Sequence, residues 1–307
     1  MQLQFTTLDV FTQSRYVGNP LAVIRVPASL RNELTEEQKQ KIAREFNYSE
    51  ITFLHEPAES EDVADFDIFT PSARMSFAGH PTIGTAVYVA QHKDAYPQIN
   101  KLRTVAGLIP FAYDADTGRA AVAIPHDVHV HRARLAHPFP SNKANKSTVP
   151  IVSIVKGMAF GLAQLVDLDA LGAVSTPLIP PADRYKREFL DAGSGWDVGY
   201  TGSFYYVDLG VDPDLPSSDS VRLLRTRSIP LHEDPGTGSA SAALCCYIAL
   251  SEGGKGLKKF HLTQGVEMGR RCDIFVAVRM REDGKGIEDV QLSGTAVEVM
   301  EGSLTVG

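Results

Sequence analysis

Two glycine-bearing loops, each followed by a run of small and apolar residues, constrain the fold of this chain more than any other feature. The first loop and its run together span residues 79–90, and the second loop and its run span residues 233–250. After each loop nearly every position is apolar or small, as expected for a helix that is enclosed by sheet on all sides. Pro81 suits the first turn of its helix, because its missing N–H has no intrahelical partner there. We therefore expect two buried helices.

The two segments lie about half a chain apart, which indicates a duplicated domain. Strand-like runs precede and follow both segments, and a more polar surface helix is expected over residues 35–46 with Thr35 as its N-cap. The sequence thus predicts an α+β protein with an N-terminal half, 1–130, and a C-terminal half, 131–307, whose terminal strands can cross between the halves. Residues 136–148, rich in Pro, Ser, Asn and Lys, are the expected flexible connection.

Composition excludes several classes of protein. The 307 residues are 43% hydrophobic and 22% charged, which is typical of a globular chain. A net charge of −7 argues against nucleic-acid and anionic-membrane partners, and no apolar run reaches the roughly 20 residues of a membrane span. The three cysteines, an adjacent pair (Cys245 and Cys246) and an isolated Cys272, fit a reducing compartment. We expect a cytoplasmic protein.

The two helix starts are candidate anion sites. A helix N-terminus presents unpaired N–H groups and a partial positive charge, and a glycine beside it lets a ligand approach the backbone. Gly79 introduces the first helix, and Gly236 and Gly238 introduce the second. Tight turns are the alternative explanation for these glycines. If the halves are pseudo-symmetric, the two starts can hold one small carboxylated substrate.

Four polar residues beside these loops are candidates for chemistry. Glu50 leads into an apolar strand, His80 follows Gly79, and Asp234 and Ser239 flank the second glycine loop. Each also has a structural explanation: Glu50 as a surface cap or one member of an ion pair, Asp234 as the cap of a turn, and Ser239 as the N-cap of its helix. By themselves the four residues do not identify an enzyme.

Together with their surrounding strings, they match a known family. Segments 9–11, 18–23, 47–53, 69–71, 77–86 (FAGHPTIGTA), 233–240 (EDPGTGSA) and 264–270 (QGVEMGR) occur in order. In these the chain resembles the PhzF-like (phenazine biosynthesis) family of cofactor-independent isomerases, nearly end to end. The resemblance implies a fold like that of diaminopimelate epimerase, in which two similar halves each wrap a curled mixed sheet or barrel around a central helix. It also implies an active site between the halves and a homodimer.

The resemblance assigns roles by motif position. The family's catalytic glutamate, histidine, aspartate and serine fall on Glu50, His80, Asp234 and Ser239. Backbone around Gly79 and Gly238 would bind the substrate carboxylate, and Gly236 and Thr237 belong to the same binding loop. In the family's best-known reaction the glutamate moves a proton between carbons of a dihydroxylated, amino-substituted ring acid. Burial raises the pKa of a carboxyl group and suits it to this task.

The expected function is a cofactor-independent, proton-transferring isomerase of biosynthetic or secondary metabolism that acts on a small carboxylated metabolite. Dehydration or cyclisation after the same proton abstraction is an open alternative. Two departures from the family pattern leave the acid–base set intact. Arg74 stands where the family usually has a glutamate, which suggests that it binds an additional anionic group on the substrate, unless it pairs with an acid such as Asp67. The loop 227–232 looks shorter than is usual in the family.

Other functions are disfavoured but not excluded. A two-thiol racemase needs a cysteine at each helix start, whereas Cys245 and Cys246 lie inside the second helix. A hydrolase would combine Ser239, His80 and Asp234, but the chain lacks a G-x-S-x-G elbow. A non-catalytic binding protein on the same fold would have no need for all four polar residues.

No metal or nucleotide cofactor is expected. His126, His129 and His131 suggest metal binding, but no carboxylate or third ligand at useful spacing accompanies His129 and His131 on their segment, and a solvated strand end explains them better. The chain also lacks the glycine-rich nucleotide-binding motifs.

Overall fold

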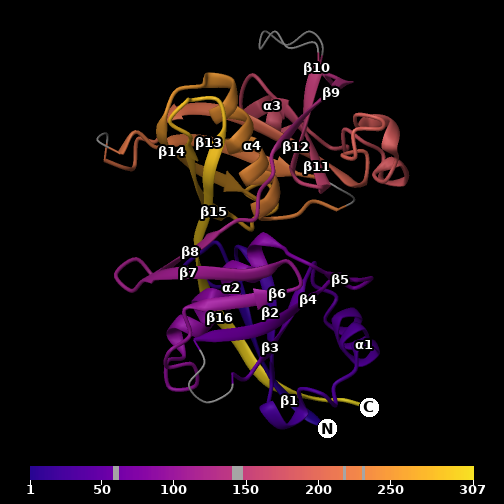
Figure 1. Ribbon diagram of the computed structural model, residues 1–307, viewed down its shortest axis with the longest axis vertical. Helices are drawn as coiled ribbons and strands as arrows, with labels where there is room; N and C mark the ends of the chain where they lie inside the picture. The colour runs from indigo at the N-terminus through magenta and orange to yellow at the C-terminus, as the bar shows by residue number, and fades with distance from the viewer. Residues whose placement is uncertain (58–61, 140–147, 217–218, 230–231) are drawn as a thin grey trace. The chain divides into compact units, whose positions relative to one another are not determined.

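A computed structural model (Figure 1) describes the whole chain except residues 58–61, 140–147, 217–218 and 230–231. Contacts divide it into two compact units. Unit 1 comprises Met1–Ala123 and Leu292–Gly307, and unit 2 comprises Ile124–Gln291. The sequence placed the division at 130/131 with terminal strands free to cross, and here the C-terminal residues belong to the first unit. Of the expected connection 136–148, residues 140–147 lie outside the described part of the chain.

Unit 1 is built on a mixed sheet that closes on itself. Its strands run in the order β1, β2, β3, β4, β6, β7, β8 and β16, and β16 pairs with β1 as well. The short β5 pairs only with β4. The strands are β1 (Gln2–Val10), β2 (Asn19–Val26), β3 (Ile51–His55), β4 (Val63–Phe69), β5 (Arg74–Met75), β6 (Lys101–Thr104), β7 (Gly107–Asp114), β8 (Arg119–Ala123) and β16 (Ile287–Thr305), the last shared with unit 2.

Helix α2 (Gly79–Gln91) is the buried helix that the sequence predicted for the first half. Every residue from Gly79 to Ala90 is buried, and the helix contacts β1, β2, β3, β7 and β8. The packing against β2 leaves no room for a side chain at Gly84, where a Cβ atom would lie 2.4 Å from Leu21 Cδ2. The closed sheet therefore holds the start of α2 in a fixed place.

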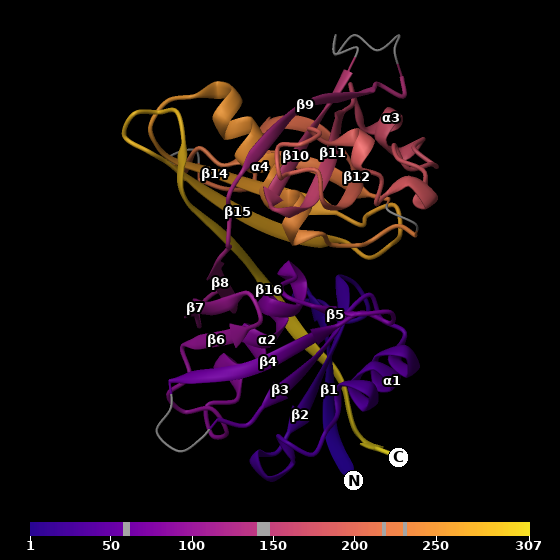
Figure 2. The same cartoon turned by 45° about the vertical axis from the view of Figure 1, so that its right-hand side comes forward.

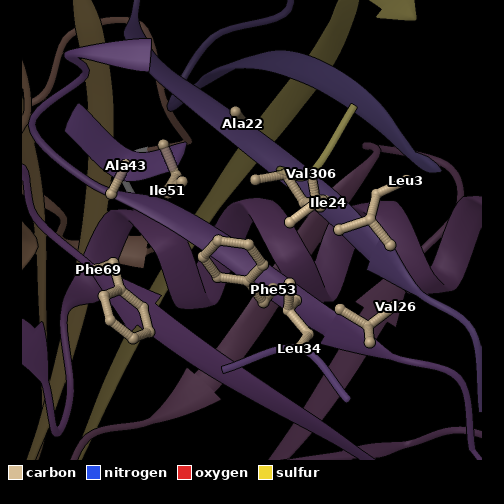
Figure 3. Packing of buried hydrophobic residues seen from close by; sticks show 10 residues of the cluster. All are labelled: Leu3, Ala22, Ile24, Val26, Leu34, Ala43, Ile51, Phe53, Phe69 and Val306. Carbon is tan, nitrogen blue, oxygen red and sulfur yellow. The ribbon is translucent and has the colours of Figure 1, made fainter. Parts of the chain in front are cut away.

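Helix α1 (Glu36–Phe46) contacts β3 and β4. Thr35 and Gln38 form a capping box at its N-terminus, as the predicted N-cap at Thr35 requires. Ala43 of the helix joins a cluster of apolar side chains, most of them from β1, β2, β3 and β4 (Figure 3), and Ile42 and Phe46 pack against it. Within that cluster the rings of Phe53 and Phe69 meet edge to face, with centroids 5.5 Å apart. A short 3₁₀ helix, η1 (Ala28–Leu30), lies between β2 and α1 in the sequence.

Unit 2 contains a second mixed sheet and a second buried helix. Its strands run in the order β15, β14, β13, β12, β11, β10 and β9. Helix α4 (Gly238–Glu252) contacts β10, β11, β14 and β15. The remaining elements are β9 (His129–Ala136), β10 (Thr148–Val155), β11 (Gly157–Gln164), α3 (Leu168–Gly172), η2 (Pro181–Asp183), η3 (Arg187–Phe189), β12 (Gly199–Val211), β13 (Arg222–Ser228), β14 (Gly256–Gln264) and β15 (Cys272–Met280).

The two units repeat one plan, which Figure 2 lets the reader follow within each. Along β1-β2-β3-β4-β6-β7 the pairings are antiparallel, parallel, antiparallel, parallel and antiparallel. Along β10-β11-β12-β13-β14-β15 the same series recurs. In both units the buried helix, α2 or α4, forms the second parallel crossover. The predicted α+β fold of two pseudo-symmetric halves, each with a mixed sheet and a central helix, is confirmed.

One strand prediction was wrong in an instructive way. From the sequence we expect separate strands at 290–292 and 296–299. The structure has one strand, β16. Gly294 lies against the ring of Phe11, where a Cβ atom would approach Phe11 Cδ1 to 2.4 Å. The strand therefore continues, and the glycine marks close packing instead of a turn. Within the described residues, no helix has the length and hydropathy of a membrane span.

Candidate active site

Glu50 and His80 meet in unit 1. Glu50 directly precedes β3, and His80 is the second residue of α2, which packs on β3. The Oε2 atom of Glu50 lies 3.5 Å from Nδ1 of His80. The Glu50 side chain is 20% exposed and that of His80 only 5%. The fold thus brings together two of the four residues expected to carry the chemistry, and it excludes most water from both.

Burial raises the pKa of Glu50, and a hydrogen bond with the Ser49 side chain opposes the shift without cancelling it. Desolvation disfavours the charged form of a carboxyl group, so Glu50 retains its proton to higher pH than an exposed glutamate does. A carboxyl group with a raised pKa is a better base when ionised and still a competent acid when protonated. The surface-cap explanation of Glu50 does not account for this environment.

Neither buried helix has a side-chain cap. The N-cap residues are Ala78 for α2 and Thr237 for α4, and neither side chain hydrogen-bonds to the first turn. Gly79 and Gly238 are the first residues of these helices. Because their backbone is helical, the tight-turn explanation does not apply to these two glycines. A glycine at this position leaves space beside the backbone N–H groups.

In unit 2, Asp234 and Thr237 are held together by one buried side chain. Thr237 Oγ1 donates a hydrogen bond of 2.5 Å to Asp234 Oδ2. The amide of Gln264, which is fully buried, donates to the carbonyl of Asp234 at 2.8 Å and to Thr237 Oγ1 at 3.0 Å, and it accepts from the N–H of Thr237 at 3.2 Å. The loop that contains Gly236 is therefore fixed at both ends.

Ser239 is not the N-cap of α4, contrary to one explanation offered from the sequence. Thr237 occupies that position, the helix begins at Gly238, and Ser239 is the second helical residue. Its side chain is half-buried. Since the serine has no capping role, its presence at the helix start needs another explanation.

A buried ion pair anchors the beginning of the same loop. Two guanidinium nitrogens of Arg227, Nε and Nη2, each donate a hydrogen bond of 2.8 Å to the carboxylate of Glu233. The Nη1 group donates to the carbonyls of Leu171 and Val174 at 2.8 Å. Arg227 is 7% exposed. It ties the loop to α3 and to β13, although Pro230 and Leu231 of the intervening loop lie outside the described residues.

Arg227 and Gln264 were not singled out by sequence reasoning. Gln264 opens the QGVEMGR string, but nothing in that string reveals that its amide turns back to residue 234. The cysteine pair, by contrast, lies where the sequence indicated. Cys245 and Cys246 are free, buried and inside α4, and burial raises the pKa of Cys246 to about 12. A thiol that holds its proton so firmly is a poor racemase base.

Arg74 forms ion pairs within unit 1. Its Nη2 binds Asp67 Oδ1, and its Nη1 lies 3.4 Å from Glu36. Lys39 and His55 bind the other oxygen of Asp67 at 2.6 and 2.9 Å. The pairing with Asp67 that was the alternative explanation for Arg74 is therefore present. Its role in substrate binding stays a prediction.

The lowered pKa of Asp67 predicts that unit 1 loses stability in acid. Burial by itself would raise the pKa of Asp67, but hydrogen bonds from His55 and Lys39 and the charges of Lys39 and Arg74 outweigh it and lower the pKa well below the ordinary value. A carboxyl group with a lowered pKa stabilises the fold above its unfolded pKa of about 3.9, and this contribution is lost as the pH falls further. We expect the urea midpoint of the protein, followed by circular dichroism, to fall steeply below about pH 4.

Asp67→Asn tests this prediction. Asp116→Asn, at an exposed position, is the control. Asp67→Asn should be less stable at pH 7 and should show a flatter dependence of stability on pH. Asp116→Asn should behave as wild type. Equal pH slopes for the wild type and Asp67→Asn would contradict the prediction.

A second prediction concerns Gly265, which lies close to Pro235 in the loop 233–238, called here the Asp234 loop. This residue has φ of +73°, and a Cβ atom there would lie 2.5 Å from the carbonyl oxygen of Arg270 and 2.7 Å from that of Pro235. Gly265→Ala should therefore cost about 2 kcal/mol in unfolding free energy, part from the left-handed backbone and part from the clash. Urea unfolding of unit 2 followed by Trp196 fluorescence measures the change.

Gly269→Ala is the matched control, since Gly269 has φ of +68° with nothing within 4 Å of a Cβ atom. It should show the backbone cost of about 1 kcal/mol without the clash. If both substitutions cost the same, the close approach of Gly265 to Pro235 has no energetic importance.

The histidines considered as metal ligands are not all at a solvated strand end. His131 on β9 is fully buried, which corrects that expectation, whereas the side chain of His129 is 28% exposed. A carboxylate at useful distance comes from elsewhere in unit 2, because Asp191 Oδ2 lies 3.1 Å from His129 Nε2. Sequence reasoning considered only neighbours along the chain and missed this residue.

Comparison with known proteins identifies relatives along the whole chain. The family model for phenazine biosynthesis-like proteins (PhzC-PhzF) matches residues 8–145 and 227–302. An uncharacterised isomerase of Pasteurella multocida is 32% identical over 237 residues, 77% of this chain and 74% of that protein. A trans-2,3-dihydro-3-hydroxyanthranilate isomerase of Pseudomonas aeruginosa is 28% identical over 305 residues, 97% of this chain and 98% of that protein.

Among solved structures, the PhzF-family phenazine biosynthesis protein of Bacillus anthracis has the same fold. It superposes with a TM-score of 0.72 at 18% identity and covers 100% of both chains. The family match includes the FAGHP and EDPGTGSA segments, which carry His80, Asp234 and Ser239, and also Glu50. This chain therefore belongs to the phenazine biosynthesis-like family, and it is an enzyme of the PhzF-like isomerase type.

Proposed function

We propose that this protein catalyses a cofactor-independent proton transfer on a small carboxylated ring metabolite and that Glu50 is the group that carries the proton. The observation that supports this most directly is the environment of Glu50. Its carboxyl group is largely buried, has a raised pKa and lies 3.5 Å from Nδ1 of His80 at the uncapped start of α2. A structural glutamate has no need of this combination.

In the proposed reaction, ionised Glu50 removes a proton from an activated carbon of the substrate. The C–H bond breaks, an O–H bond forms on Glu50, and the electron pair spreads into the unsaturated system of the substrate. The protonated Glu50 then returns its proton to a different carbon, so the net change is an isomerisation. Partial positive charge at the start of α2 would stabilise a substrate carboxylate near Gly79 and the charge that develops as the C–H bond breaks.

We also propose that Asp234 and Ser239 orient the substrate and assist the transfer, with Gly236, Thr237 and Gly238 supplying backbone contacts. Two features support this part: the family match over residues 227–302 and the rigid loop in which Gln264 and Thr237 hold Asp234. A homodimer and a cytoplasmic location remain predictions from the resemblance and the composition.

For the substrate we propose a ring acid of the dihydro-hydroxyanthranilate type, because several relatives are named as isomerases of trans-2,3-dihydro-3-hydroxyanthranilate. The first experiment is a thermal-shift screen of this compound and other carboxylated ring metabolites. Each compound that stabilises the protein is then incubated with it in D₂O and followed by NMR and mass spectrometry.

Deuterium entering a ring carbon with no change in formula supports isomerisation. Loss of the mass of water identifies dehydration or cyclisation through the same abstraction. A compound that saturates the site but exchanges no carbon-bound hydrogen would contradict the proposed chemistry and favour a binding protein on the same fold.

A further inference from the structure

A cluster of metal-ligating side chains in unit 2 takes no part in the proposed reaction. His129 and His131 lie two residues apart on β9, and Asp191 follows η3. One ring nitrogen from each histidine and one carboxylate oxygen lie within 4.8 Å of one another. The Asp191 Oδ2 atom is 3.1 Å from His129 Nε2 and 4.0 Å from His131 Nδ1. The three donors come from two segments that are about sixty residues apart in sequence.

The hydrogen bonds around His131 select the ring form that a metal ion requires. Nδ1 accepts a bond of 3.2 Å from the backbone N–H of Asp191 and therefore carries a lone pair. The other nitrogen, Nε2, then bears the proton and donates to Ser153 Oγ at 2.8 Å. Metal-bound histidines characteristically hold the second ring N–H in such a bond, which fixes the ring orientation. The lone pair of His131 is thus on the nitrogen that lies 4.0 Å from the carboxylate oxygen Oδ2 of Asp191.

Asp191 is oriented in a comparable way. Its Oδ1 atom accepts hydrogen bonds from the backbone N–H groups of Arg132 and Ala133 at 2.8 and 3.2 Å. This leaves Oδ2 directed at His129. Since the His129 side chain is 28% exposed while His131 is fully buried, the cluster has one side open to solvent and one closed.

We propose that His129 Nε2, His131 Nδ1 and Asp191 Oδ2 bind a divalent transition-metal ion of the zinc type, with solvent completing the coordination. Two imidazoles and one carboxylate suit zinc, cobalt and nickel, and they do not suit magnesium, which prefers oxygen ligands. Binding replaces the proton that His129 Nε2 shares with Asp191, and it competes with the long bond from the Asp191 N–H to His131. The ion would join β9 to the segment after η3 and stabilise unit 2, independently of Glu50.

The only tryptophan of the chain provides the measurement. The ring of Trp196 stacks on that of His129, with centroids 4.8 Å apart and an interplanar angle of 9°. In full-length protein stripped with EDTA, Co²⁺ should quench this fluorescence saturably with a stoichiometry of one. Zn²⁺ should displace Co²⁺ and restore the signal, and Mg²⁺ should have no effect. Saturating Zn²⁺ should raise the thermal midpoint by roughly 5 °C, reversibly with EDTA.

Two variants assign the ligands. Asp191→Asn keeps an oxygen for the N–H groups of Arg132 and Ala133 but replaces the ligating oxygen with an amide nitrogen. His129→Phe keeps an aromatic ring against Trp196 and removes the nitrogen. Each should weaken Co²⁺ binding at least about 100-fold, since losing even a residue that orients a ligand costs 10–100-fold. His126→Phe, outside the cluster, should bind as wild type.

The wild-type protein alone can overturn the proposal. No saturable Co²⁺ quenching and no Zn²⁺ shift of the thermal midpoint would show that the cluster is only a hydrogen-bonded brace. Binding that survives in both Asp191→Asn and His129→Phe would place the ion elsewhere and would equally contradict it.

Discussion

Glu50→Gln is expected to abolish turnover while leaving the fold and substrate binding intact. Glutamine has nearly the same shape as glutamate, and it remains able to form hydrogen bonds in the partly buried site beside Ser49 and His80. It cannot accept and return a proton. Because general acid–base catalysis contributes about 10²–10⁴-fold in rate, the loss in kcat should be on the order of 10³-fold or more. Substrate-dependent deuterium incorporation measured by NMR in D₂O reports the lost step directly.

Removing the buried carboxylate should not destabilise the protein. Ionisation of Glu50 opposes folding, because its pKa is raised by burial, so the neutral variant should be at least as stable as wild type above pH 5. Glu45→Gln, an exposed change five residues away on α1, is the matched control and should retain full activity. Deuterium exchange by Glu50→Gln at the wild-type rate would show that another group carries the proton.

A variant of His80 distinguishes its role from that of Glu50 in the same assay. His80→Asn retains a polar group beside the carboxyl of Glu50 but has no basic ring. If His80 only orients Glu50 and the substrate, the variant should lose part of kcat and still exchange deuterium slowly. The pair of variants therefore distinguishes the proton carrier from its neighbour.

Much of the fold could be predicted from local patterns in the sequence. Residues 79–90 and 239–250 are small or apolar on nearly all faces, and the structure encloses them in α2 and α4. Thr35 with Gln38 three residues later gives a capping signal that needs no tertiary information. The sequence does not reveal that β16 continues through Gly294, because glycine is found both in turns and in tightly packed strands. Only the ring of Phe11 decides between them.

The residues of the candidate site likewise fall into those that the sequence reveals and those that only the folded structure reveals. Glu50, His80, Asp234 and Ser239 lie in family strings that are contiguous in sequence, so the resemblance reaches them. Gln264, Arg227 and Asp191 act through partners that are 30, 56 and about 60 residues away. Such contacts depend on sheet register and crossover packing, which alternation of residue types does not encode. The residues that hold the site are therefore harder to find than those expected to perform the chemistry.

Among these holding residues, Arg227 should have the largest effect on stability. Arg227→Met preserves the length of the side chain but leaves the half-buried carboxylate of Glu233 without its partner and frees three carbonyl groups, those of residues 171, 172 and 174. Breaking a buried ion pair from one side typically costs 3–5 kcal/mol. We expect a loss of about 3 kcal/mol in the unfolding free energy of unit 2, since the Glu233 side chain is 17% exposed and gains some hydration. Urea unfolding followed by Trp196 fluorescence measures it.

The double variant Arg227→Met/Glu233→Gln tests the cause of that loss. If an uncompensated charge dominates, neutralising Glu233 should recover part of the stability that Arg227→Met removes, although the three carbonyls remain without their donor. Lys255→Met is the surface control, because Lys255 and Glu282 are 71% and 89% exposed and their pairing should contribute nothing measurable. A double variant less stable than Arg227→Met would show that Glu233 stabilises the loop without the arginine. An Arg227→Met variant as stable as Lys255→Met would show that the Asp234 loop does not depend on this anchor.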